Sequence, residues 1–166
     1  MKEYKQLAVA FTGPSNEGKT TLVVKLSNLL QEQGFKVAII KHDPCDKAIF
    51  DKEGKDSDRY TKTGADVIVT SPTRTTMFKQ EEKSIEDMAK LFGKFDYLLV
   101  EGLKTIPLPR LCVCRNQINY DYFDVSDAIL IDVNLQEKPQ QEITSIDLDN
   151  HEAIISWIDQ NGKQLI

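Results

Sequence analysis

The sequence contains no apolar run long enough to cross a membrane, few cysteines and no excess of basic residues. It has 166 residues, with 21 Lys and Arg against 26 Asp and Glu, so the formal net charge is −5. This acidic balance argues against a general binder of nucleic acid or of anionic membranes. The run 7–11 is much shorter than the roughly 20 residues of a transmembrane helix and is too short for a secretory signal. We therefore expect a cytoplasmic protein that binds neither nucleic acid nor membrane.

Cysteine is scarce, and its positions do not suggest a disulfide framework. The three cysteines are Cys45, Cys112 and Cys114, and an odd number without a signal is typical of free thiols in a reducing compartment. Cys112 and Cys114 lie in an apolar run, which predicts buried thiols. That position argues against a zinc site, although His42 and Cys45 have a spacing that metal ligands can adopt.

Short apolar runs alternate with amphipathic segments, a pattern that predicts an α/β three-layer sandwich. Residues 7–11 and 36–41 are expected to be buried strands on either side of a helix that ends at Gly34. We expect one domain over residues 1–166, with a β excursion around residues 44–55 that forms a short hairpin or an ordered loop. Further strands are expected at 66–70, 75–79, 97–100, 111–114 and 128–133, and further helices at 56–63, at 85–92 and after Asp149.

A phosphate-binding loop follows the first expected strand. The residues GPSNEGKT at 13–20 match G-x-x-x-x-G-K-[ST] at every position, between a strand and a helix. Backbone N–H groups of such a loop and of the helix N-terminus attract phosphate oxygens. Lys19 is expected near the β- and γ-phosphates, and the Thr20 hydroxyl on Mg²⁺. This predicts a P-loop NTPase-like sandwich with a mostly parallel sheet, and the predicted nucleotide-binding residues are Gly13, Pro14, Ser15, Asn16, Glu17, Gly18, Lys19, Thr20 and Thr21.

A P-loop needs an acidic partner at the end of a neighbouring strand. Asp96 precedes the expected strand 97–100, whereas Glu101 follows it. Ligands bind at the carboxyl ends of parallel strands, so Glu101 is the predicted partner. Together with Thr20 it forms the predicted metal site, and it is the catalytic candidate, holding Mg²⁺ through water or orienting the attacking water.

Two further features of the same sheet edge leave alternatives open. His42 and Asp43 end the second expected strand. His42 could bind an anion, and Asp43 could contact Mg²⁺ through water. The alternative is that the segment is an ordinary strand end. No N-K-x-D or T-K-x-D stretch follows a late strand, and the segment 132–134 is only a weak candidate for approaching a base. The residues alone therefore do not separate ATP from GTP.

Several segments together resemble the MobB family, the molybdopterin-guanine dinucleotide biosynthesis adaptor proteins. The resemblance runs from about residue 7 to about residue 115. Where the family tends to show K-H-x-x-H, this chain has Cys45 at the second histidine position. The matching segments are GPSNEGKTTL at 13–22, KHD at 41–43, DKEGKDSDRYTKTGA at 51–65 and VEGLK at 100–104.

The resemblance implies a homodimer that binds GTP with Mg²⁺ and has at most slow GTPase activity. It also implies association with the MobA nucleotidyltransferase, which joins GMP to molybdopterin, and a role in delivering nucleotide or transferring molybdopterin or its guanine dinucleotide. Glu101 would lie on the Mg²⁺ side with Lys104 as a nearby cation, and Asp56 and Ser57 near the γ-phosphate or the dimer partner. The apolar residues 48–50 in a charged segment are a second indication of a partner.

Two other classes of function remain. The first is a small-molecule ATP-dependent ligase or kinase of the dethiobiotin synthetase type, which also pairs a P-loop with V-E-G. Those enzymes are generally longer and carry substrate motifs that this sequence lacks. The second is a non-catalytic adaptor whose nucleotide site only controls assembly. Titration with GTP and ATP, with and without Mg²⁺, is the single observation that would help most in choosing among these functions.

Overall fold

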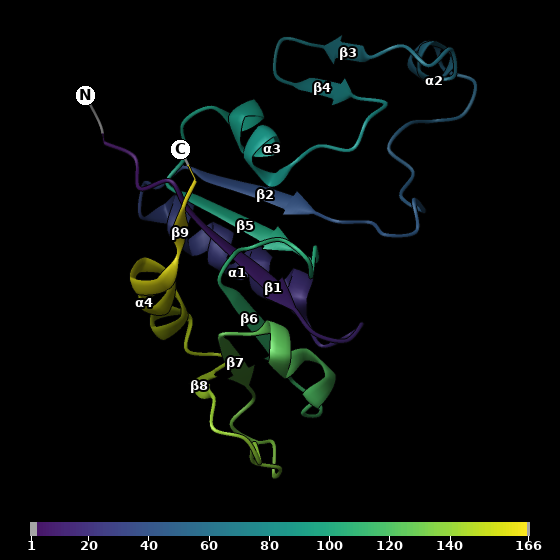
Figure 1. The fold of residues 1–166 in the computed structure, drawn as a ribbon. Coiled ribbons are helices and arrows are strands. Elements are labelled where there is room, and N and C mark those ends of the chain that lie inside the picture. Colours follow the sequence, from purple (N-terminus) through teal and green to yellow (C-terminus); the bar gives the residue numbers. More distant parts are fainter. Residues whose placement is uncertain (1–2, 166) are drawn as a thin grey trace. The chain divides into compact units, whose positions relative to one another are not determined.

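The chain has an α/β architecture that divides into two compact units. The computed structural model describes residues 3–165. One unit contains residues 1–42 and 85–166, and the other contains residues 43–84. Figure 1 shows the order of the elements along the chain. We describe each unit separately.

A mostly parallel sheet forms the centre of the larger unit. Its strands β1, β2, β5, β6, β7 and β8 are all parallel to their neighbours, and β9 pairs antiparallel with β1. In the register, Glu101 lies opposite both Phe11 and Lys41, so the carboxyl ends of β1, β2 and β5 meet at one edge. This confirms the predicted sheet. The order is β2 (Val37–Lys41), β5 (Tyr97–Glu101), β1 (Leu7–Thr12), β6 (Arg110–Cys114), β7 (Ala128–Ile131) and β8 (Thr144–Asp147), with β9 at Lys163–Gln164.

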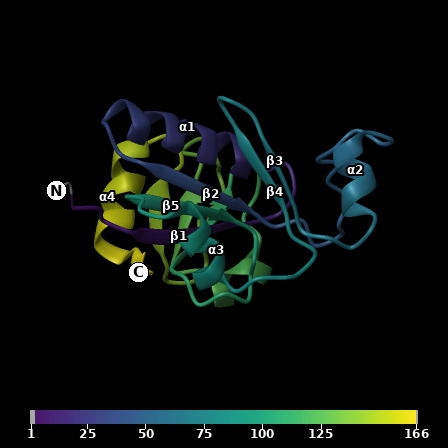
Figure 2. The ribbon, with the colours of Figure 1, turned by 90° about the horizontal axis from the view of Figure 1, so that it is seen from above.

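Helices cover both faces of this sheet, which gives the three predicted layers. Helix α1 (Lys19–Glu32) lies on one face and α3 (Ile85–Phe92) on the other, as Figure 2 shows. Helix α4 (His151–Asn161) shares a buried cluster with α1, and the 3-10 helix η1 (Tyr120–Val125) packs on residues of β6. Alternation along β1 sends Val9 and Phe11 toward α1 and Ala8 and Ala10 toward α3.

The expected elements of this unit lie within two residues of their observed bounds, but three elements were not predicted. These are β8, β9 and η1. The last helix was expected after Asp149, and the side chain of Asn150 caps it by accepting the N–H of Ala153 at 3.0 Å. Among the described residues, no helix has the length and apolar character that crossing a membrane requires.

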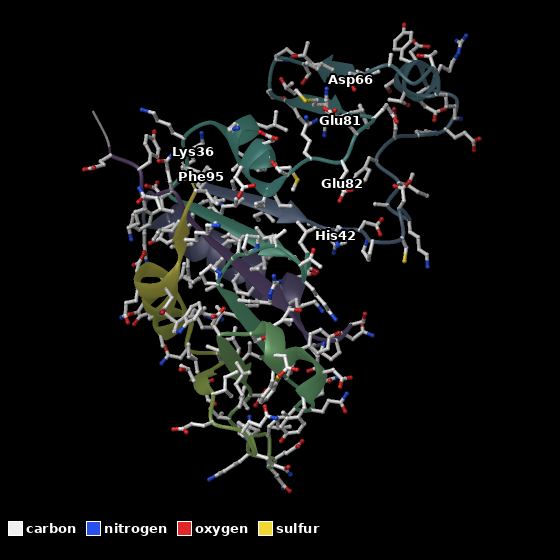
Figure 3. The ribbon with its side chains drawn as sticks, viewed as in Figure 1. Lys36, His42, Asp66, Glu81, Glu82 and Phe95 are labelled. Atoms are coloured by element: carbon white, nitrogen blue, oxygen red, sulfur yellow. The ribbon has the colours of Figure 1, made fainter. Side chains whose placement is uncertain are left out.

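The smaller unit contains one short helix and one hairpin. Helix α2 spans Asp56–Thr61, and the antiparallel strands β3 (Val67–Thr70) and β4 (Thr75–Phe78) follow it. Residues 44–54 form a loop with turns and contain no strand. Of the two expected alternatives, a short hairpin or an ordered loop, the structure shows the loop. Asp66 pairs with Lys79 across the open end of the hairpin, and Figure 3 labels Asp66 there.

Few apolar side chains are buried in this smaller unit. All of its residues are described, and Val67, at 9% exposed, is the one that is buried. Ile49 and Phe50 are 90% and 79% exposed. The unit therefore presents apolar surface that a small domain would normally cover.

Candidate functional site

The P-loop connects β1 to α1 through two glycines that no other residue could replace easily. Gly13 has φ +128°, and a Cβ there would lie 2.7 Å from the carbonyl oxygen of Val113. Gly18 has φ +86°, and its Cβ would lie 3.1 Å from Nε of Arg115. Both the backbone conformation and the close neighbours therefore require glycine.

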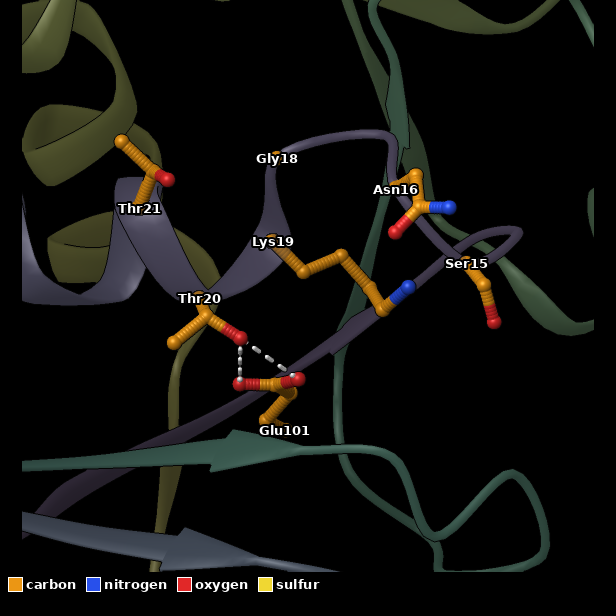
Figure 4. Close-up of a pocket in the computed structure, with 7 residues that line it drawn as sticks. All are labelled: Ser15, Asn16, Gly18, Lys19, Thr20, Thr21 and Glu101. Carbon is orange, nitrogen blue, oxygen red and sulfur yellow. Dashed lines mark hydrogen bonds between the residues drawn. The ribbon is translucent and has the colours of Figure 1, made fainter.

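An open pocket lies between this loop and the carboxyl end of β5. Its volume is about 440 Å³, and Figure 4 shows Glu101 facing the start of α1. Glu101 thus joins residues of the P-loop in one site, as the edge of a parallel sheet predicts. The lining residues are Ser15, Asn16, Gly18, Lys19, Thr20, Thr21 and Glu101.

The Lys19 side chain folds back over the loop. Its Nζ donates to the carbonyl oxygens of Gly13 and Pro14, at 2.9 and 2.5 Å. Burial lowers the pKa of Lys19, and the charge of Glu101 opposes this shift. Gly13 and Pro14 do not line the pocket but hold the ammonium group at its edge.

Thr20 and Glu101 are in direct contact. The Oγ1 of Thr20 lies 3.0 and 2.9 Å from the two carboxylate oxygens of Glu101 (Figure 4). A hydroxyl and a carboxylate are oxygen ligands of the kind that Mg²⁺ prefers. These two side chains are therefore chemically suited to hold Mg²⁺ beside a bound phosphate.

The cation beside Glu101 is Lys41, at the end of β2. Its Nζ lies 3.5 Å from Oε1 of Glu101. The resemblance had implied Lys104 for this place, but the Nζ of Lys104 lies over the Tyr122 ring, 3.9 Å from the ring centroid. Lys41 was missed because its proximity depends on the register of β2 with β5. The only signal in the sequence was its position at the end of the second strand.

His42 and Asp43 have local partners. The His42 N–H donates to the carbonyl oxygen of Glu101 at 2.9 Å. The Asp43 carboxylate accepts the N–H groups of Lys47 and Ala48, each at 2.6 Å, and that of Cys45 at 3.3 Å. These hydrogen bonds lower the pKa of Asp43, and the N–H of Ala48 contributes most to that shift. The Asp43 carboxylate thus stabilises its own loop by accepting these backbone N–H groups.

Asp56 and Ser57 begin α2 without capping it. No side chain caps this helix, and the carboxylate of Asp58 accepts the N–H of Gly54 at 2.8 Å. Both residues belong to the smaller unit. Their implied place near the γ-phosphate or a dimer partner stays a prediction.

Glu17 points away from the pocket. Its side chain is 4% exposed, and its carboxylate accepts the N–H groups of Arg115 and Asn116 at 2.7 and 2.8 Å. Arg115 in turn reaches Asp132, at 3.5 Å, and Asp149, at 3.8 Å. The Glu17 side chain therefore ties the P-loop to the end of β6 instead of facing a ligand.

Four remaining candidates do not line the pocket. Asp96 lies at the amino end of β5, where its carboxylate accepts the Lys36 N–H at 2.7 Å. Cys112 and Cys114 are fully buried with their Sγ atoms 3.7 Å apart, and Cys45 is exposed. The buried pair confirms the expectation of core thiols.

The comparisons with known proteins agree on one family. The family model described as "Molybdopterin guanine dinucleotide synthesis protein B" (MobB) matches residues 8–134. This chain belongs to the MobB family. A MobB relative from Escherichia coli, named molybdopterin-guanine dinucleotide biosynthesis adapter protein, is 30% identical over 93% of this chain and 95% of its own length. A Haemophilus influenzae MobB protein with the same name is 32% identical over 74% of this chain and 71% of its own length.

A solved MobB structure supports the fold. The crystal structure of Bacillus subtilis MobB superposes with a TM-score of 0.74 at 22% identity, and covers 93% of this chain and 98% of the other. At 22% identity, this similarity shows that the two proteins share a fold. Family membership rests on the sequence matches, and it favours the MobB interpretation over the dethiobiotin synthetase alternative.

Proposed function

We propose that this chain is an adaptor in molybdopterin guanine dinucleotide formation that binds GTP with Mg²⁺ and assists a MobA-type nucleotidyltransferase. Membership of the MobB family and the names of the relatives support the pathway. The exposed free thiol of Cys45 suits the reducing cytoplasm, where we place the protein. Molybdopterin or its guanine dinucleotide is the cofactor that the assembled proteins handle.

The observation that carries the nucleotide part is the contact of Thr20 with Glu101 in the P-loop pocket. Backbone N–H groups of the loop and of the first turn of α1 bind phosphate oxygens, and the Lys19 ammonium moves from the carbonyl groups to the phosphates. Thr20 and Glu101 would hold Mg²⁺, which would supply positive charge beside the phosphates. Glu101 also orients a water molecule for slow attack.

The composition of the pocket supports slow hydrolysis at most. Among its lining residues, all of which are described, Lys19 is the one cation. Fast P-loop GTPases add an arginine that stabilises the transferred phosphoryl group and contributes about 10³–10⁵ to the rate. A pocket whose lining includes no arginine therefore suits binding and control more than rapid turnover.

We also propose a homodimer, through the smaller unit. An isolated two-stranded hairpin is marginally stable in water, and residues of this unit such as Ile49, Phe50 and Ile68 are exposed. Burial of these side chains against a second copy stabilises both the hairpin and the dimer.

The experiment that tests the nucleotide site is single-turnover GTP hydrolysis by Glu101→Gln at several Mg²⁺ concentrations. The amide keeps the shape but loses the charge, so we expect GTP binding to persist while the Mg²⁺ dependence and most of the residual hydrolysis are lost. Glu32→Gln, at an exposed position late in α1, is the matched control. A Glu101→Gln protein that behaves like the control excludes Glu101 from the site.

A further inference from the structure

We infer that Lys41 occupies the metal side of the Glu101 carboxylate when no metal is bound, and that Mg²⁺ must displace it. The inference rests on the proposed Mg²⁺–nucleotide function. It gives Lys41 the role of a competing cation that raises the Mg²⁺ concentration needed to fill the site. The binding of metal, and with it of nucleotide, thereby depends on the position of the Lys41 side chain at the end of β2.

The backbone fixes Lys41 beside Glu101. The two residues lie opposite each other in the parallel register of β2 and β5, and the N–H of the next residue, His42, donates to the carbonyl oxygen of Glu101 at 2.9 Å. The Nζ of Lys41 therefore reaches Oε1 of Glu101, at 3.5 Å, from a constrained position. Strand pairing thus holds the backbone of Lys41 within side-chain reach of Glu101.

The two side chains differ in their freedom to move. The side chain of Lys41 is 62% exposed, whereas that of Glu101 is 13% exposed and also contacts Thr20. Lys41 can therefore swing into water at little cost, while the carboxylate stays in place. An arriving cation would displace the lysine and keep the glutamate.

The Lys41 ammonium group and Mg²⁺ repel each other and cannot both occupy the same carboxylate oxygen of Glu101. Lys19 and Lys41 both lie near the single carboxylate of Glu101, and Lys41 contributes to the lowered pKa of Lys19. A divalent ion on the same oxygen brings two further positive charges to within a few ångströms of the ammonium group. Repulsion at that distance favours release of Lys41.

The alternative role for Lys41 predicts the opposite sign. If its ammonium group binds nucleotide phosphate, its removal weakens nucleotide binding and raises the Mg²⁺ requirement. If it competes for Glu101, its removal lowers the Mg²⁺ requirement. One titration therefore separates the two roles.

The test is a Mg²⁺ titration of the binding of a fluorescent GTP analogue to the full chain. We expect Lys41→Met to lower the half-saturating Mg²⁺ concentration about two- to five-fold, the range for loss of an exposed ion pair. Lys41→Arg keeps the competitor and should give a value no lower than wild type. Lys90→Met removes an equal charge from α3, where Lys90 pairs with Asp87, and should change nothing. Thermal unfolding checks that all variants fold.

The titration separates failure of the role inferred for Lys41 from failure of the proposed function. If the wild-type chain binds the analogue without any response to Mg²⁺, the proposed function fails. If the wild type responds and Lys41→Met gives the same or a higher half-saturating concentration, only the role of Lys41 is overturned.

Discussion

The Glu17 carboxylate accepts the backbone N–H groups of Arg115 and Asn116, at 2.7 and 2.8 Å. This buried contact joins the loop after β1 to the segment after β6. The Arg115 side chain then lies against Gly18, since a Cβ there would be 3.1 Å from its Nε. The shape of the phosphate loop is thus supported from behind by a neighbouring strand end.

Replacement of Glu17 tests this support. Both N–H groups donate to the same oxygen of Glu17, Oε2, so Glu17→Ala removes the acceptor of both at once. We expect the free energy of unfolding to fall by about 1–3 kcal/mol, measured by urea denaturation. Glu32→Ala, at an exposed site on α1, should have almost no effect. Equal stability of the two variants contradicts a supporting role for Glu17.

Replacement of Lys19 tests the phosphate role of the P-loop. In the structure Nζ of Lys19 donates to the carbonyl oxygens of Gly13 and Pro14, within its own loop, so Lys19→Ala should fold normally. Loss of its charge-assisted contact should weaken nucleotide binding by about 2–3 kcal/mol, measured by calorimetry. Lys25→Ala, on the exposed face of α1, is the control. Wild-type affinity in Lys19→Ala refutes the phosphate role.

Replacement of Phe50 tests the dimer. An aspartate cannot be buried at the interface that we propose, and loss of one buried aromatic side chain corresponds to about 1.5–3 kcal/mol. We therefore expect Phe50→Asp to raise the dimer dissociation constant about ten- to hundred-fold. Light scattering across a dilution series measures it, with Leu91→Asp on α3 as an exposed apolar control. A wild-type monomer at tens of micromolar, with and without GTP, excludes the dimer.

The sequence was sufficient for elements that carry strong periodicity or a complete motif. Strand β1 is a continuous apolar run, the helix after it has leucines on one face, and Gly13–Thr20 matches its motif at every position. Glu101 could be placed because the end of a parallel strand has a known direction. Elements without such signals were missed: η1 is mostly polar or aromatic, and β8 is short and half exposed.

The contacts in the site depend on the register of neighbouring strands, and a single sequence does not specify that register. Lys41 reaches Glu101 because β2 pairs with β5 in one alignment, and no local pattern specifies that alignment. Glu17 was predicted as a nucleotide-binding residue from its place in the motif, which constrains the backbone of the loop. The direction of its side chain depends on its neighbours. Its tie to residues 115–116 required β6 to lie beside β1.

The measurement that tests the central claim most directly is a parallel titration of the full chain with GTP and ATP, with and without Mg²⁺. Calorimetry gives both affinities under one set of conditions. The account predicts that GTP binds more tightly than ATP, that Mg²⁺ strengthens GTP binding, and that Lys19→Ala loses most of it. Equal binding of the two nucleotides, a preference for ATP, or affinities that do not respond to Mg²⁺ would contradict it.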